Sequence, residues 1–149
     1  MKKFNFRLER ILRFKEQIEQ QKRLILADKS RLLKREKAQL VELAAKKESY
    51  LRVYSSLFRG KIDVPRLKTT LNYIDRVSGD MVMQARRVVN AETKSEEAKI
   101  EVRDSMRDRK KYDKLKERKH KEYDFNINRE EQKELDEIAS RLKKTILTE

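Results

Sequence analysis

Apolar residues recur at seven-residue steps along the first part of the chain. One series contains four residues: Ile11, Ile18, Ile25 and Leu32. A heptad repeat keeps its members on one side of a helix that supercoils with a partner helix. The companion series is apolar at its two ends and basic between them: Leu8, Lys15, Lys22, Lys29, Leu43, Tyr50 and Leu57. The pattern therefore predicts a helix over about residues 6–58, with a packing seam that is half polar at its start.

A second apolar stripe runs beside this predicted seam. Its members are Leu26, Leu33, Leu40 and Tyr54. Such a stripe either widens the face that packs on the partner helix, which we favour, or forms a second surface for a different molecule.

Small residues form the heptad pattern of the second half of the chain. The two alternating series are Val88, Ser95 and Val102 with Ala91, Ala98 and Ser105, and the pattern ends at Tyr112. Small side chains let two helices approach closely, so this stripe suits pairing with the larger residues of the first helix. In an antiparallel hairpin that turns near residue 62, Val88 is expected near residues 33–41 and Val102 near residues 18–25.

Glycine and proline mark the boundary between the two arms. The chain has two glycines and one proline, and Gly60 precedes Pro65 by five residues. A turn over about residues 59–64 is expected, with Asp63 as the N-cap of a short helix over about 65–77. Residues 78–80, Ser-Gly-Asp, are expected to kink or recap the chain before a long helix over about 81–145. The predicted fold is all-α: residues 1–149 form a single domain, a long antiparallel two-helix coiled-coil hairpin with a short extra helical segment near the turn.

Composition agrees with a solvated hairpin. Charged residues make up 44% of the chain, mean hydropathy is −0.99, and Trp and Cys are absent. Full disorder is the alternative, but the apolar spacing and the scarcity of Gly and Pro favour helices. The lack of Cys excludes a disulfide framework and thiol chemistry. Because the basic N-terminal residues are not followed by an apolar run and no stretch is long enough for a membrane span, we expect a soluble cytoplasmic protein.

The net charge of +14 is concentrated in the first arm. Residues 1–60 contain 17 Lys and Arg against 7 Asp and Glu, whereas residues 61–149 contain 23 against 19. Such an excess suits nucleic acid or an anionic membrane, but the interspersed acids suit a solvated helix surface equally well, so we expect no nucleic-acid partner. The most charged stretch, residues 107–123, is either a solvated helix held by pairs one turn apart or a docking surface.

Catalytic constellations are not evident in the sequence. Two isolated glycines cannot form a phosphate-binding loop. The acid pairs Glu96-Glu97 and Glu130-Glu131 are adjacent in sequence, so their side chains point in different directions on a helix and cannot act together. His120 is the only histidine and is surrounded by Lys and Arg, which makes it a poor metal ligand. We therefore expect a non-enzymatic protein without cofactor, metal or small-molecule substrate.

Aromatic and apolar residues gather around the predicted turn. They are Tyr50, Tyr54, Leu57 and Phe58 before it and Leu71, Tyr73, Ile74 and Val77 after it. A two-helix hairpin has little capacity to bury such a set at its end, so part of it is a candidate partner surface. A closed three-helix tip that buries all of them is the alternative.

Three blocks of sequence together resemble the flagellar FliJ family. They are residues 1–16 (MKKFNFRLERILRFKE), residues 112–118 (YDKLKER) and residues 130–139 (EEQKELDEIA). The resemblance implies a cytoplasmic component of the bacterial flagellar type III export apparatus, peripheral at the inner face of the cell membrane at the flagellar base. It also implies a stalk-like coiled coil that promotes the assembly and activity of the export ATPase FliI hexamer, links it to the gate protein FlhA and meets export chaperones.

The same resemblance assigns surfaces to partners. The half of the chain near its termini, residues 4–32 and 112–147, would face the ATPase ring, with these candidates: Phe4, Phe6, Leu8, Ile11, Tyr112, Leu115, Tyr123, Leu135 and Ile138. The turn end would reach the gate through Tyr50, Tyr54, Phe58, Tyr73 and Val77. A stalk protein of a virulence-type secretion system or a rotary ATPase, and a basic helical nucleic-acid-binding protein, are the alternative functions.

Overall fold

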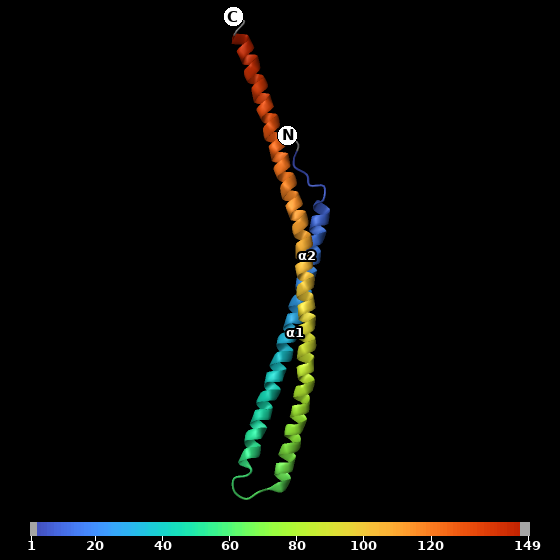
Figure 1. Ribbon diagram of the computed structural model, residues 1–149, viewed down its shortest axis with the longest axis vertical. Coiled ribbons are helices and arrows are strands. Elements are labelled where there is room, and N and C mark those ends of the chain that lie inside the picture. Colours follow the sequence, from blue (N-terminus) through green and yellow to red (C-terminus); the bar gives the residue numbers. More distant parts are fainter. Residues whose placement is uncertain (1–2, 147–149) are drawn as a thin grey trace. The chain divides into compact units, whose positions relative to one another are not determined.

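Two helices account for almost all of the described chain. The computed structural model describes residues 3–146, and the side chains of residues 3–141. Helix α1 spans Glu9–Ser56 and α2 spans Val64–Ile146, and the described residues contain no strand. Figure 1 shows the turn that joins them. The predicted antiparallel two-helix hairpin is confirmed.

The turn between the helices is built as its residue types predict. Gly60 has a φ of 94°, a left-handed conformation that glycine adopts without steric cost. The Asp63 carboxylate accepts a hydrogen bond from the Arg66 backbone N–H at 3.2 Å, and the Asp63 carbonyl accepts one from Leu67 N–H at 3.0 Å. Asp63 is therefore the N-cap of α2, and Pro65 lies in the first turn, where its missing N–H is not needed.

The expected break at residues 78–80 is absent, because α2 is one continuous helix from Val64 to Ile146. The Ser78 hydroxyl donates to the carbonyl of Ile74 at 2.8 Å, a contact inside the helix that replaces the capping role expected of this serine. The buried positions also keep their heptad phase through this region, at Ile74, Val77 and Gln84. Packing thus outweighs the poor helix propensity of Gly79. The predictions of a separate short helix over about 65–77 and of a three-helix tip are therefore wrong.

Gly79 offers a direct test of this continuity. A Cβ added at Gly79 would meet nothing within 4 Å. We expect Gly79→Ala to raise the free energy of unfolding by about 0.5–1 kcal/mol, because alanine loses less conformational freedom in a helix interior. Gly60→Ala is the contrasting variant, and it should destabilise because of the positive φ at Gly60. Chemical denaturation measures both; a destabilised Gly79→Ala protein would mean that the helix is broken there.

The chain packs as two compact units. Unit 1 combines residues 1–19 with residues 105–149, and unit 2 comprises Gln20–Asp104 with the turn. In each unit a segment of α1 packs antiparallel on a segment of α2. The single domain predicted from the sequence stays a prediction.

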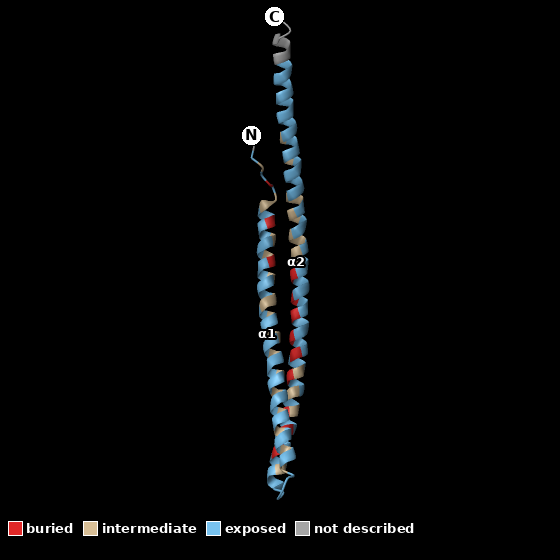
Figure 2. Ribbon diagram, turned by 90° about the vertical axis from the view of Figure 1, so that its left-hand side faces the viewer, coloured by how far each residue is buried: buried red, intermediate tan, exposed pale blue. Residues whose placement is uncertain are grey.

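The core of unit 2 lies on the predicted small-residue face of α2. Its buried residues repeat at alternating four- and three-residue steps, apart from one seven-residue step between Val77 and Gln84: Thr70, Ile74, Val77, Gln84, Val88, Ala91, Ser95, Ala98 and Val102. Figure 2 shows buried positions in red along one side of the middle part of α2. The predicted heptad of residues 88–102 is confirmed, and it extends back through Thr70.

The seam of α1 agrees with the prediction in part. Ile11 and Ile25 are 40% and 44% exposed, whereas Ile18 and Leu32 are half-buried. The neighbouring stripe with Leu26, Leu33 and Leu40 is also half-buried, as expected if it widens the packing face. The seam combines this stripe with the companion series of lysines. Lysine stems can lie along apolar surface while their ammonium groups reach acids on the other helix, so lysines can share the seam with the leucine stripe.

Ion pairs fix the register of the two helices in unit 2. Lys22 Nζ lies 2.5 Å from Glu101 Oε2, and Lys37 Nζ lies 2.6 Å from Glu92 Oε1. The buried amide of Gln84 donates to the backbone carbonyl of Glu36 at 3.0 Å. These contacts agree with the positions predicted for Val88 and Val102 against α1.

Candidate functional site

Unit 1 contains a charged layer between the helices. Glu19 is 4% exposed, and its Oε2 accepts a hydrogen bond from Arg109 Nε at 2.6 Å. The guanidinium of Arg109 also pairs with Asp113 on its own helix. The hydrogen bond with Glu19 raises the pKa of Arg109 above its ordinary value.

The flanks of this layer carry more exposed pairs. Lys15 Nζ lies 3.4 Å from Asp108 Oδ2, and Lys116 Nζ lies 2.8 Å from Glu9 Oε2. Hydrogen bonds from Lys111 and from Lys15 lower the pKa of Asp108. The charged stretch of residues 107–123, expected to be either solvated or a docking surface, therefore packs on α1 in its first part through ion pairs. Its last part is held by pairs within α2, such as Lys121 with Glu117 at 2.7 Å.

The N-terminal segment crosses α2 beyond the start of α1. Phe6 is 8% exposed, and its carbonyl accepts a hydrogen bond from Glu9 N–H at 3.0 Å, which fixes the segment to the first turn of α1. The ring of Phe4 lies 4.7 Å from the ring of His120 and 5.5 Å from that of Tyr123, measured between centroids. Two phenylalanines thus hold an extended segment against a helix face that is otherwise highly charged.

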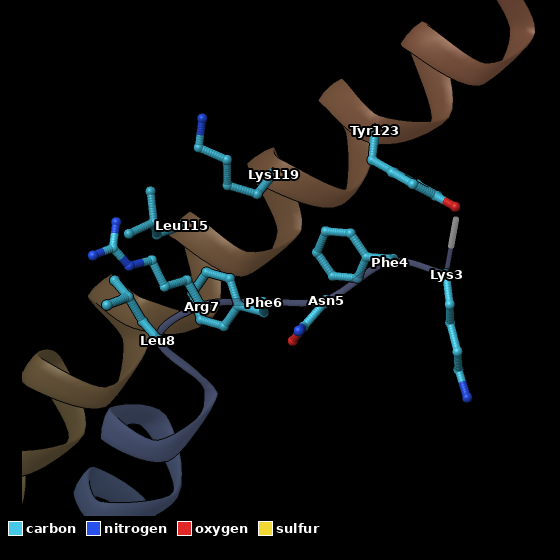
Figure 3. A pocket seen from close by; sticks show the side chains of 9 residues that line it. All are labelled: Lys3, Phe4, Asn5, Phe6, Arg7, Leu8, Leu115, Lys119 and Tyr123. Carbon is cyan, nitrogen blue, oxygen red and sulfur yellow. The ribbon is translucent and has the colours of Figure 1, made fainter. Parts of the chain in front are cut away.

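A pocket opens between this segment and α2. Its volume is about 570 Å³, and Figure 3 shows the residues that line it: Lys3, Phe4, Asn5, Phe6, Arg7, Leu8, Leu115, Lys119 and Tyr123. The apolar side chains come from both the segment and successive turns of α2. Every charged residue in the lining is a cation. We call this site the N-terminal pocket.

The N-terminal pocket gathers five of the nine candidates for contact with an ATPase ring: Phe4, Phe6, Leu8, Leu115 and Tyr123. Tyr112 is half-buried, and Ile11 is exposed beside the seam. Leu135 and Ile138 are 60% and 56% exposed on a part of α2 where residues 128–141 are all exposed. The last residue of the predicted surface, Leu147, lies outside the described residues. The sequence analysis did not select the cationic lining residues Lys3, Arg7 and Lys119. The positions of Lys3 beside Phe4 and of Arg7 beside Phe6 could have indicated two of them.

The turn end of unit 2 carries the other candidate surface. The rings of Tyr50 and Tyr73 lie 4.0 Å apart across the two helices, and those of Tyr54 and Phe58 lie 5.2 Å apart. A hydrogen bond with Tyr73 raises the pKa of Tyr50. Phe58 is 52% exposed, so it is the most accessible of these aromatic side chains.

One member of the predicted turn-end surface belongs to the core. Val77 is 4% exposed in the seam, so it cannot meet a partner while the helices are packed. Exposed apolar residues near the turn that sequence reasoning did not select are Leu51, Val53, Ile62 and Val64. For Leu51 and Val53 the signal was their position off the heptad of α1, which becomes clear only when the seam is known.

No group of acids and histidines that could hold a metal ion occurs among the described residues. Within the same part of the chain, neither helix has a stretch that is apolar over the length needed to cross a bilayer.

Comparison with known families identifies the protein family of this chain. The sequence model described as "Flagellar FliJ protein" matches residues 4–144, which is nearly the whole chain. The chain belongs to the FliJ family. A comparison with curated proteins gives no significant match. Membership makes the protein a component of the type III export apparatus of the stalk type.

A solved structure shares the FliJ-family hairpin. It is described as a proposed YscO homolog, CT670, from Chlamydia trachomatis. The two chains are 22% identical, the alignment covers 99% of each, and the TM-score is 0.64. At this identity the likeness concerns the fold: the two-helix architecture of this FliJ-family protein extends along essentially the full length of both chains.

Proposed function

We propose that this protein is the stalk of the flagellar export ATPase. In this proposal it associates with the FliI hexamer at the cytoplasmic side of the flagellar base, promotes ring assembly and ATP hydrolysis, and links the ring to the gate protein FlhA. The match to the FliJ family over residues 4–144 supports the assignment to the apparatus. The protein acts through contacts and contributes no catalytic group.

The observation that carries this proposal is the presence of two different partner-competent surfaces. The N-terminal pocket is apolar with cationic residues around it, and it lies beside the start of α1. The turn end presents aromatic residues, with Phe58 most exposed. A protein that joins two partners needs two such surfaces.

ATP hydrolysis by the export ATPase of the same organism tests the proposal. The ATPase is titrated with this protein while hexamer formation is followed in parallel. We expect stimulation that saturates well below one chain per ATPase subunit, together with more hexamer. If the ATPase neither binds the protein nor changes its rate, the hairpin stands but the stalk function is excluded.

The turn-end surface yields a separate prediction for gate binding. We expect Phe58→Ala to weaken binding to the cytoplasmic domain of the gate protein by about tenfold, because exposed aromatic side chains often dominate interfaces. Its thermal stability should hardly change, since Phe58 is 52% exposed. Tyr73→Ala is the comparison: it removes the contact with Tyr50 and should lower the melting temperature. Calorimetry and a binding titration measure both; unchanged gate affinity of the Phe58→Ala protein would remove this surface from the interface.

A further inference from the structure

We infer that the N-terminal pocket binds an acidic peptide segment that carries one large apolar side chain. The inference takes one point from the proposed function, namely that the N-terminal pocket binds a protein partner. It adds which kind of peptide segment of that partner the pocket binds.

The shape and lining of the pocket define the anchor. A volume of about 570 Å³ is within the range of specific binding pockets and can hold an aromatic side chain with its neighbouring backbone. Phe4, Phe6, Leu8 and Leu115 provide apolar surface (Figure 3). Because Phe6 is buried and fixed by the hydrogen bond to Glu9 N–H, the site is formed before a ligand arrives.

The charges around the pocket define the flanking residues of the ligand. Lys3, Arg7 and Lys119 line it, and no acid does. Lys3 and Arg7 form no ion pair with any described residue, whereas Lys119 is shared with Glu122 at 2.6 Å. Unpaired cations beside an apolar surface favour an anionic partner and disfavour a basic one, which gives the site charge selectivity.

Backbone groups favour a peptide over a small molecule. Phe4 and Asn5 lie in the extended segment before α1, and their backbone groups form no hydrogen bond within the described part of the chain. An extended peptide that lies along this segment can use these donors and acceptors while its side chain enters the pocket.

A labelled peptide tests the inference directly. The probe is a fluorescein-labelled heptapeptide with one central phenylalanine flanked by glutamates, and binding to the full-length protein is followed by fluorescence anisotropy. We expect saturable binding that weakens as salt is raised. Replacing the phenylalanine by alanine, or the glutamates by lysines, should weaken binding by about tenfold or more.

Matched protein variants locate the binding site. The double variant Arg7→Glu with Lys119→Glu should lose about tenfold or more in affinity. The control, Lys34→Glu with Arg35→Glu, changes the net charge equally at exposed residues of unit 2 and should bind as the unchanged protein does. Circular dichroism verifies that both variants keep their helices.

Several results would overturn the inference. They are equal affinity for the glutamate and lysine peptides, equal losses in the two double variants, or no saturable binding. If the protein binds anionic vesicles through Arg7 and Lys119 but does not bind the peptide, the pocket is a membrane-binding site. If the protein self-associates and the Arg7→Glu, Lys119→Glu variant does not, the pocket binds a second copy of the chain. Because no ATPase is present, failure here is separate from failure of the stalk proposal, which the ATPase titration reports.

Discussion

Replacing Arg109 by alanine is expected to lower the free energy of unfolding by roughly 2–3 kcal/mol, an unusually large effect for a charged residue of a solvated hairpin. The cause is Glu19, which is only 4% exposed and accepts the 2.6 Å hydrogen bond from Arg109. Without the guanidinium, the buried Glu19 carboxylate loses its hydrogen bond from α2, and keeping its charge between the helices becomes more costly. Urea denaturation at neutral pH measures the loss.

Two further variants separate the loss of a buried ion pair from the loss of an ordinary surface arginine. Arg129→Ala removes an exposed arginine of α2 and should change stability by no more than about 0.5 kcal/mol. The double variant Glu19→Leu with Arg109→Leu should recover most of the lost stability, because the two leucines form an apolar layer. If Arg109→Ala loses no more stability than Arg129→Ala, the Glu19–Arg109 layer contributes no more to stability than an exposed arginine does.

Overpacking the small-residue face of α2 should have the second large effect. Ala98 is 6% exposed and lies between Ala91 and Val102 in the seam. We expect Ala98→Phe to destabilise the protein by about 2–3 kcal/mol, since an aromatic ring in a close-packed seam forces the helices apart or strains the side chain. Thermal unfolding followed by circular dichroism provides the measurement.

The matched control places the same ring on the outside of a helix. Ala45 is an exposed residue of α1, so Ala45→Phe should change stability by less than about 0.5 kcal/mol. An Ala98→Phe protein as stable as the Ala45→Phe protein would show that the small residues do not form the packed face.

The fold was predictable where the residue types and their spacing indicate the same local structure. Asp63 and Pro65 carry the helix-start signal, and the small heptad of α2 has no competing stripe. The heptad placed Lys15 and Lys22 in the seam of α1, but the sequence alone could not identify the acids of α2, distant in sequence, that pair with them there. Gly79 was misleading for a similar reason: local propensity favours a break, but packed residues on both sides keep the helix continuous.

The candidate surfaces were predictable in part. Phe4, Phe6, Leu115 and Tyr123 were selected from the sequence, but it could not reveal that an extended segment folds across α2 and joins them in one pocket. The buried position of Val77 required the heptad phase to continue through Gly79. Apolar residues alone do not distinguish core from surface in a hairpin, since both lie on the same two helices.

The stoichiometry of the complex with the export ATPase tests the stalk proposal most directly. Native mass spectrometry of the ATP-bound ATPase ring, mixed with an excess of this protein, gives the number of chains per ring. The proposal predicts one chain per hexamer. A complex with one chain per ATPase subunit, or rings that carry none, would contradict it.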